Sequence, residues 1–232
     1  MATLVYVPGL LSDARVWKPV AEAVGGDYRI ADVTEPPSIT AMAEHALGLA
    51  VGDVIPVGHS MGGRVAMEMA RIAPERMAGL ILADTGHHPL GNTEPEKRLE
   101  KVALGYDDMA ALAADWLPPM VDADRRGDTA FMDDMTEMVV ACGPEVHERQ
   151  IRALMNRPDA GAHLDAVTCP VLLLVGTGDL WSPEKQHREI AEMVGAEAKV
   201  VVIPDAGHFL PCERPAEVAT AISAWLKATS LT

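Results

Sequence analysis

Cysteine is scarce in this chain. The 232 residues include only Cys142, Cys169 and Cys212, which are far apart, odd in number and without C-x-x-C spacing. Small disulfide-stabilised domains and cysteine-rich zinc sites need a denser pattern of cysteines. We therefore expect reduced thiols in the core, rather than a disulfide framework or a metal site.

The chain also lacks a long apolar run and an excess of basic residues. No apolar run approaches the length of a membrane span, and residues 1–9 lack the basic lead and cleavage site of a signal peptide. Lys and Arg number 19 against 34 Asp and Glu, giving a net charge of −15. Such a charge argues against nucleic acid or an anionic membrane as the partner. We expect a cytoplasmic protein, monomeric or homodimeric, that acts on a small molecule.

Short strand patterns alternate with helical patterns along most of the chain. The apolar fraction of 49% and the length of 232 residues fit one α/β domain with room for an insertion. Crossover helices between short strands predict a mostly parallel, doubly wound sheet of about six strands. The expected strands are 4–7, 29–33, 54–57, 79–83, 171–175 and 200–203, and the expected helices are 14–24, 39–50, 61–72, 183–194 and 216–228.

One stretch interrupts this alternation. Residues 91–157 contain helical patterns and no convincing strand. A helical insertion after a strand of such a sheet is typical of a cap over the site, although an ordinary helical flank would have the same pattern. We therefore expect a core formed by residues 1–90 and 158–232, with residues 91–157 as an inserted cap.

The pentapeptide 58–62, GHSMG, stands between an apolar strand pattern and a helix pattern. G-x-S-x-G in that context is the nucleophile elbow, a sharp strand-to-helix turn that exposes a serine hydroxyl. The flanking glycines avoid collisions in the crowded turn, and the helix N-terminus favours negative charge nearby. Ser60 is therefore the candidate nucleophile. His59, inside the elbow, is expected to pack or orient the turn.

A serine nucleophile needs a base and an acid partner for that base. Two later strand patterns end in glycine-containing turns, one leading to Asp179 and the other to His208. The carboxyl ends of parallel strands meet at one edge of a sheet. The order serine, aspartate, histidine is that of the elbow-serine hydrolases. We assign His208 as the base and favour Asp179 as the acid, with Asp84 and Asp205 as alternatives.

The same chemistry needs two backbone N–H groups directed at the developing oxyanion. One is expected from Met61, which directly follows the nucleophile. The other is expected from Leu10, in the loop after the first strand, where Gly9 permits the bend.

Together these motifs resemble the α/β-hydrolase superfamily, and in particular its small, cap-bearing, serine esterase-like members. The segment SDARVW at 12–17 adds to the likeness. The resemblance implies an α/β-hydrolase fold lacking the first two strands, the site roles given above, and no cofactor or metal in the reaction. The chain departs from the common pattern at Pro8, where many relatives have a histidine before the glycine of the oxyanion loop.

The favoured reaction is hydrolysis of a carboxylic ester through an acyl-enzyme. Opening of a lactone or hydrolysis of a C–C bond uses the same residues, and a non-enzymatic ligand-binding relative is a further alternative. Arg64, four residues after Ser60, resembles the elbow of a menaquinone-pathway lyase that makes a succinyl-cyclohexadiene carboxylate, so an anionic substrate is the runner-up. Candidate substrate-binding residues are Arg64, His87, Trp116, Trp181 and Phe209.

Overall fold

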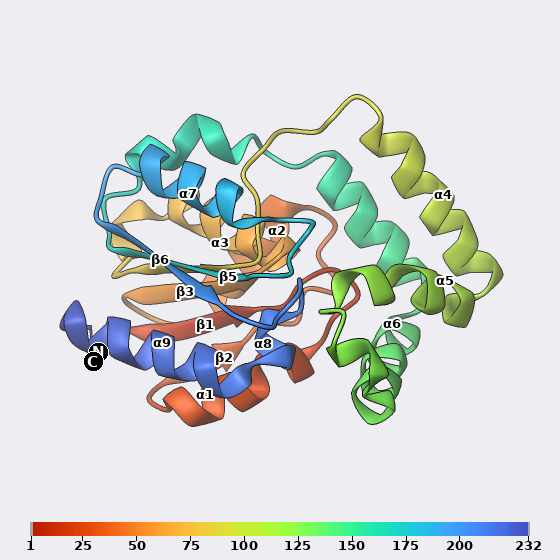
Figure 1. Cartoon of the computed structure of the whole chain (residues 1–232). Helices are drawn as coiled ribbons and strands as arrows, with labels where there is room; N and C mark the ends of the chain where they lie inside the picture. The colour runs from red at the N-terminus through yellow and green to blue at the C-terminus, as the bar shows by residue number, and fades with distance from the viewer. Residues whose placement is uncertain (1, 232) are drawn as a thin grey trace.

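A parallel sheet runs through the centre of the computed structural model, which describes residues 2–231 (Figure 1). The strands are hydrogen-bonded in the order β2-β1-β3-β4-β5-β6, and each neighbouring pair is parallel. Their bounds are β1 (Thr3–Val7), β2 (Tyr28–Ile30), β3 (Val54–His59), β4 (Leu80–Ala83), β5 (Val171–Gly176) and β6 (Ala198–Ile203). The predicted fold class is confirmed, although the second strand stops at Ile30 rather than at residue 33.

Helices cover both faces of the sheet, as a doubly wound topology requires. One face carries α2 (Ile39–Gly48), α3 (Met61–Ile72) and α7 (Glu184–Met193), and the other carries α1 (Lys18–Val24) and α9 (Pro215–Ala228) (Figure 1). The short elements η1 (Ala14–Val16), η2 (Pro74–Arg76), η5 (Ala160–Ala166) and α8 (Leu210–Glu213) complete the core. The single helix expected over residues 14–24 is thus a 3₁₀ turn followed by a short helix.

The sheet separates two apolar layers because side chains alternate along each strand. On β1, Leu4 and Tyr6 pack in the cluster that contains Trp17 of the α1 side. Val5 and Val7 pack instead with the α2 and α3 side. Burying side chains of this size stabilises the fold by about 1.5–3 kcal/mol each. Both faces of the strand are therefore fixed, and the loop that follows β1 leaves the sheet at a defined position.

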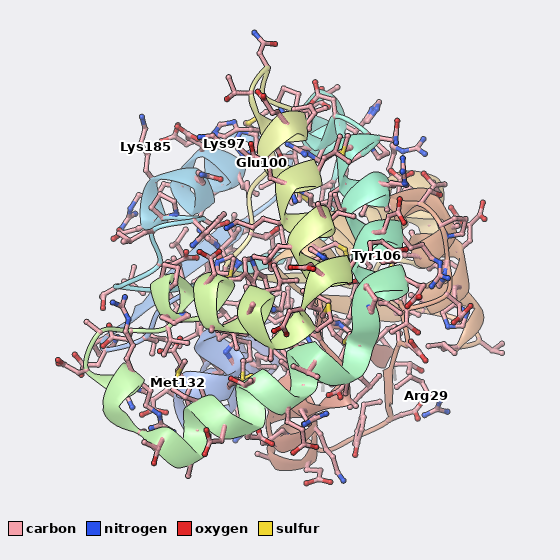
Figure 2. The ribbon with its side chains drawn as sticks, turned by 90° about the vertical axis from the view of Figure 1, so that its right-hand side faces the viewer. Arg29, Lys97, Glu100, Tyr106, Met132 and Lys185 are labelled. Atoms are coloured by element: carbon pink, nitrogen blue, oxygen red, sulfur yellow. The ribbon has the colours of Figure 1, made fainter. Side chains whose placement is uncertain are left out.

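Residues 91–157 form a helical layer beside one end of the sheet. They contain α4 (Glu94–Asp107), α5 (Met109–Trp116), η3 (Pro118–Met120), η4 (Arg125–Gly127) and α6 (Thr129–Met155). Figure 2 shows α4, α5 and α6 lying across the side of the molecule that faces the viewer. The helix α6 is broken near its middle, because Gly143 has φ +77° and Pro144 follows it.

No helix within residues 2–231 is both long and apolar enough to cross a membrane. Cys142, Cys169 and Cys212 are free thiols. Cys169 is buried, and the other two are partly buried.

Candidate active site

Ser60 lies in a strained turn between β3 and α3. Its backbone has φ +54° and ψ −115°, in the region that favours glycine. The turn is so tight that a Cβ at Gly58 would lie 2.2 Å from the carbonyl oxygen of Gly62. A Cβ at Gly62 would lie 2.1 Å from the carbonyl oxygen of Val7. The two glycines of the pentapeptide are therefore required by packing, and the serine side chain is directed away from the crowded backbone.

His208 links Ser60 to Asp179. Its Nε2 atom is 2.8 Å from Ser60 Oγ, and its Nδ1 atom is 3.0 Å from both carboxylate oxygens of Asp179. Asp179 Oδ1 also accepts hydrogen bonds from two backbone N–H groups. Burial opposes ionisation of this carboxyl, but His208 and the N–H donors lower its pKa to about 2. A charged acceptor thus holds the Nδ1 proton, which leaves Nε2 free to accept the serine proton.

The two alternative acids have other contacts. Asp84 is buried, and its carboxylate oxygens accept hydrogen bonds from the N–H groups of Gly176 and Leu210. Burial and the neighbouring Asp179 carboxylate raise the pKa of Asp84 well above its usual value. Asp205 occupies a turn with φ +55°. Within residues 2–231, neither Asp84 nor Asp205 is hydrogen-bonded to His208, so the structure brings only Asp179 to it.

His59 supports the backbone of His208. Its Nε2 atom is 2.6 Å from the carbonyl oxygen of His208, and its ring lies 5.5 Å from that of Phe209 between centroids. Burial lowers the pKa of His59 to about 3, so the ring is neutral at pH 7 and donates from Nε2. A Cβ at Gly9 would lie 2.9 Å from His59 Nδ1, so the loop after β1 also packs on this ring. His59 therefore holds two loops together.

The N–H groups of Leu10 and Met61 are free of protein acceptors within residues 2–231. Met61 is the first residue of α3, where no intrahelical acceptor exists. The loop that carries Leu10 is held by Ser12, whose hydroxyl donates to the Leu10 carbonyl, and by Gln150. The Gln150 side chain accepts from the N–H of Leu11, which has φ +51°. Gln150 thus stabilises this loop, in which Pro8 stands where the resemblance leads us to expect a histidine.

Sequence reasoning missed Glu213, a buried carboxylate beneath the His208 loop. Its Oε1 atom accepts from the N–H of Gly207 at 3.0 Å and of Phe209 at 3.2 Å, on either side of His208. Its Oε2 atom accepts from the N–H of Asp122 at 2.9 Å. The N–H of His208 itself donates to the carbonyl of Met120 at 2.7 Å. Residues of the 91–157 segment and Glu213 therefore fix the histidine's backbone.

The predicted aromatic substrate-binding residues lie around these groups in different environments. Phe209 is buried and packs edge-on against Trp116, with 6.0 Å between ring centroids. Trp181 is 52% exposed, and its backbone N–H donates to Asp179 Oδ1. The role of all three in binding substrate stays a prediction.

Arg64 lies one turn into α3 and has an unpaired guanidinium nitrogen. Its Nη1 atom is buried and has no hydrogen-bond partner within residues 2–231. Burial and the nearby cation of Arg157 lower the pKa of Arg64 to about 9. Arg157 and Arg98 both pair with Glu94, and the Glu94 carboxylate acts on Arg64 only through its charge, without an ion pair. Arg64 also lines a hollow with Met67, Glu68, Arg71 and residues of η5, and Ser60 does not line it.

The comparisons with known proteins agree with this geometry. Residues 4–221 match the alpha/beta hydrolase family. The chain belongs to this family. Across nearly its whole length it is similar to both curated and structurally characterised members.

A curated relative is the 2-succinyl-6-hydroxy-2,4-cyclohexadiene-1-carboxylate synthase of Escherichia coli O17:K52:H18, which is 28% identical over 97% of this chain and 93% of its own. A thermophilic esterase from Thermogutta terrifontis, solved with malate bound, is 29% identical with a TM-score of 0.89, covering 99% of this chain and 90% of its own. The enol-lactonase of Burkholderia xenovorans LB400 shares the fold at 22% identity, with a TM-score of 0.82 over 97% of this chain and 91% of its own.

Proposed function

We propose that this alpha/beta hydrolase cleaves carboxylic esters of small molecules through an acyl-enzyme. The observation that carries the proposal is the hydrogen-bonded series from Ser60 Oγ through His208 to Asp179, with distances of 2.8 and 3.0 Å. In the proposed reaction His208 Nε2 takes the hydroxyl proton as Ser60 Oγ attacks the ester carbonyl. The imidazolium then protonates the leaving alkoxide, and an alcohol departs. A water molecule, deprotonated by His208, releases the acid and restores Ser60.

The N–H groups of Leu10 and Met61 are proposed to stabilise the oxyanion of each tetrahedral intermediate. Preorganised donors in such a position are worth about 3–4 kcal/mol each. The helix α3, which begins at Met61, adds its positive N-terminal end. The 91–157 segment is proposed as the cap, because Met120 and Gln150 contact the His208 loop and the Leu10 loop.

The esterase proposal is tested with p-nitrophenyl esters of short and medium acyl chains. The Ser60→Ala variant should lose turnover by at least about 10³-fold. Ser223→Ala, on the surface helix α9, is the control and should turn over as wild type does. Labelling with a fluorophosphonate probe should likewise occur at Ser60 in the wild type and vanish in Ser60→Ala. Ester turnover that survives in Ser60→Ala would refute the mechanism, and a wild type that is neither labelled nor active on esters would refute the function.

A second candidate is lyase chemistry on an anionic substrate, as in the synthases to which the chain is 28% identical. The unpaired Nη1 of Arg64, beside Arg98 and Arg157, supports it because buried guanidinium groups bind carboxylates strongly. Arg64 lines a hollow that Ser60 does not line, which argues against contact between Arg64 and a substrate bound at Ser60. Measuring formation of 2-succinyl-6-hydroxy-2,4-cyclohexadiene-1-carboxylate by wild type and Arg64→Ala separates the two. Formation by wild type that Arg64→Ala abolishes, with ester turnover unchanged, would establish the lyase.

A further inference from the structure

A second cluster of side chains with ligand chemistry includes none of the residues Ser60, His208 and Asp179. His87 and His88 are in the loop after β4, and Glu189 is on α7. One ligand atom from each residue lies within 4.8 Å of the other two. Two imidazoles and one carboxylate form a ligand set that zinc takes in proteins. We propose that His87, His88 and Glu189 bind a Zn²⁺ ion.

Two of the three residues have a buried polar atom without a partner. Within residues 2–231, neither His87 Nδ1 nor Glu189 Oε2 makes a hydrogen bond. Buried polar atoms normally have a hydrogen-bond partner, so each buried atom without one needs a physical explanation. Glu189 Oε2 lies 3.4 Å from His88 Nε2, which brings the third donor to the same place. A cation bound between these atoms would give both His87 Nδ1 and Glu189 Oε2 a partner.

The charges around the cluster suit a cation. The carboxylates of Glu189 and Asp159 favour a cation beside His87, while Arg64 opposes it. Lys185 Nζ stands 3.8 Å from the other oxygen of Glu189, Oε1, and leaves Oε2 available.

The distances allow binding with a small movement. Ligands bonded to zinc at about 2.0–2.2 Å in a tetrahedron stand about 3.4 Å apart. The His88 and Glu189 side chains are 53% and 32% exposed, so both have room to rotate inward. The rings of His87 and His88 are already 4.2 Å apart between centroids. Three protein ligands leave the fourth position for water.

A zinc ion here joins two parts of the fold. The loop that carries His87 and His88 leads from β4 into α4, the first helix of the 91–157 segment. Helix α7, which carries Glu189, follows the loop that holds Asp179. The bound ion therefore stabilises the folded state by linking these elements, and this role does not depend on the reaction at Ser60.

Zinc titration of the untagged, chelator-treated protein tests the proposal, with a chromophoric chelator as competitor. The wild type should bind one Zn²⁺. His88→Ala and Glu189→Gln should weaken binding more than about tenfold, because loss of even an outer-shell partner has an effect of that size. These two residues are chosen because they are exposed or half-buried, so their replacement should leave the fold intact. His45→Ala, an exposed histidine on α2, and Glu192→Gln, an exposed glutamate on α7, are the matched controls.

A second measurement distinguishes a built site from loose surface binding. Zinc at about a hundredfold its Kd should raise the Tm of the wild type by about 5 °C and should not raise that of His88→Ala. Co²⁺ in place of Zn²⁺ should give visible absorption bands typical of tetrahedral coordination in wild type alone. Equal zinc affinity in wild type and His88→Ala, or an equal loss in His45→Ala, would overturn the proposal.

Discussion

Replacing Asp179 with asparagine changes the hydrogen-bonding pattern of the site while keeping the shape of the side chain. Asp179 Oδ1 accepts from the N–H groups of Trp181 and Ser182 at 2.8 and 2.9 Å. In Asp179→Asn these two donors hold the amide oxygen at the Oδ1 position. The amide NH₂ group must then occupy the Oδ2 position, 3.0 Å from His208 Nδ1.

The consequence for His208 is the wrong tautomer. Nδ1 is 3.0 Å from both positions, but an Nδ1–H group would face the amide NH₂, so we expect the tautomer in which Nδ1 accepts and the ring proton is on Nε2. An Nε2–H group donates to Ser60 Oγ and cannot take its proton. The imidazolium of the proposed reaction also loses its carboxylate partner. We expect kcat to fall by about 10³–10⁴-fold, the scale known for this change in a serine protease, which corresponds to about 4–5.5 kcal/mol.

The assay is kcat for p-nitrophenyl ester hydrolysis, measured together with Tm, and Asp84→Asn is the matched control. Asp84 accepts from Gly176 and Leu210 through its two oxygens, so an amide there leaves one N–H without an acceptor. That costs about 1–3 kcal/mol of stability and lowers Tm by about 2–10 °C, with kcat within about tenfold of wild type. If a folded Asp84→Asn loses as much kcat as Asp179→Asn, or if Asp179→Asn retains it, the tautomer argument is wrong.

Three further predictions concern stability. Gly62→Ala should fail to fold, because its Cβ would lie 2.1 Å from the Val7 carbonyl oxygen. Gly127→Ala, at a position with open space around it, should be soluble and keep the wild-type Tm. A soluble Gly62→Ala protein with wild-type circular dichroism would contradict this prediction. Glu213→Gln should lower Tm by about 2–8 °C and reduce kcat, because the amide has only one oxygen and cannot accept from the N–H of Asp122 and from the N–H groups of the His208 loop together. The control Glu217→Gln, at an exposed position, should match wild type in both measurements. Burial lowers the pKa of His147 to about 4, below its usual 6.5, so the unfolded state takes up this proton first as the pH falls. The free energy of unfolding therefore decreases between pH 6.5 and pH 4, by up to about 1.4 kcal/mol per pH unit. His147→Gln should show a shallower fall of Tm over this pH range, and parallel Tm curves for the two proteins would refute the assignment.

The sequence predicts those parts of the structure that depend on local pattern and strand direction. Apolar strands separated by helical periods predict a parallel sheet, and the structure contains one with six strands. The carboxyl ends of parallel strands share an edge, and this rule accounts for the position of His208 within hydrogen-bond distance of both Ser60 and Asp179. Element ends are less well predicted, as the edge strand Tyr28–Ile30 shows, which pairs with β1 at only these three residues.

The contacts that hold the site in place depend on residues far apart in the sequence, and no local pattern points to them. Gln150 and Leu11 are 139 residues apart in the sequence. In the sequence Glu213 resembles an ordinary surface glutamate of a helix, although the fold buries its side chain. Met120 contributes only a carbonyl group, which any residue would supply. Because Met120 and Gln150 both belong to the 91–157 segment, that segment forms part of the frame that fixes the His208 and Leu10 loops. Substitutions that shift it should therefore change kcat, and not only the affinity for substrate.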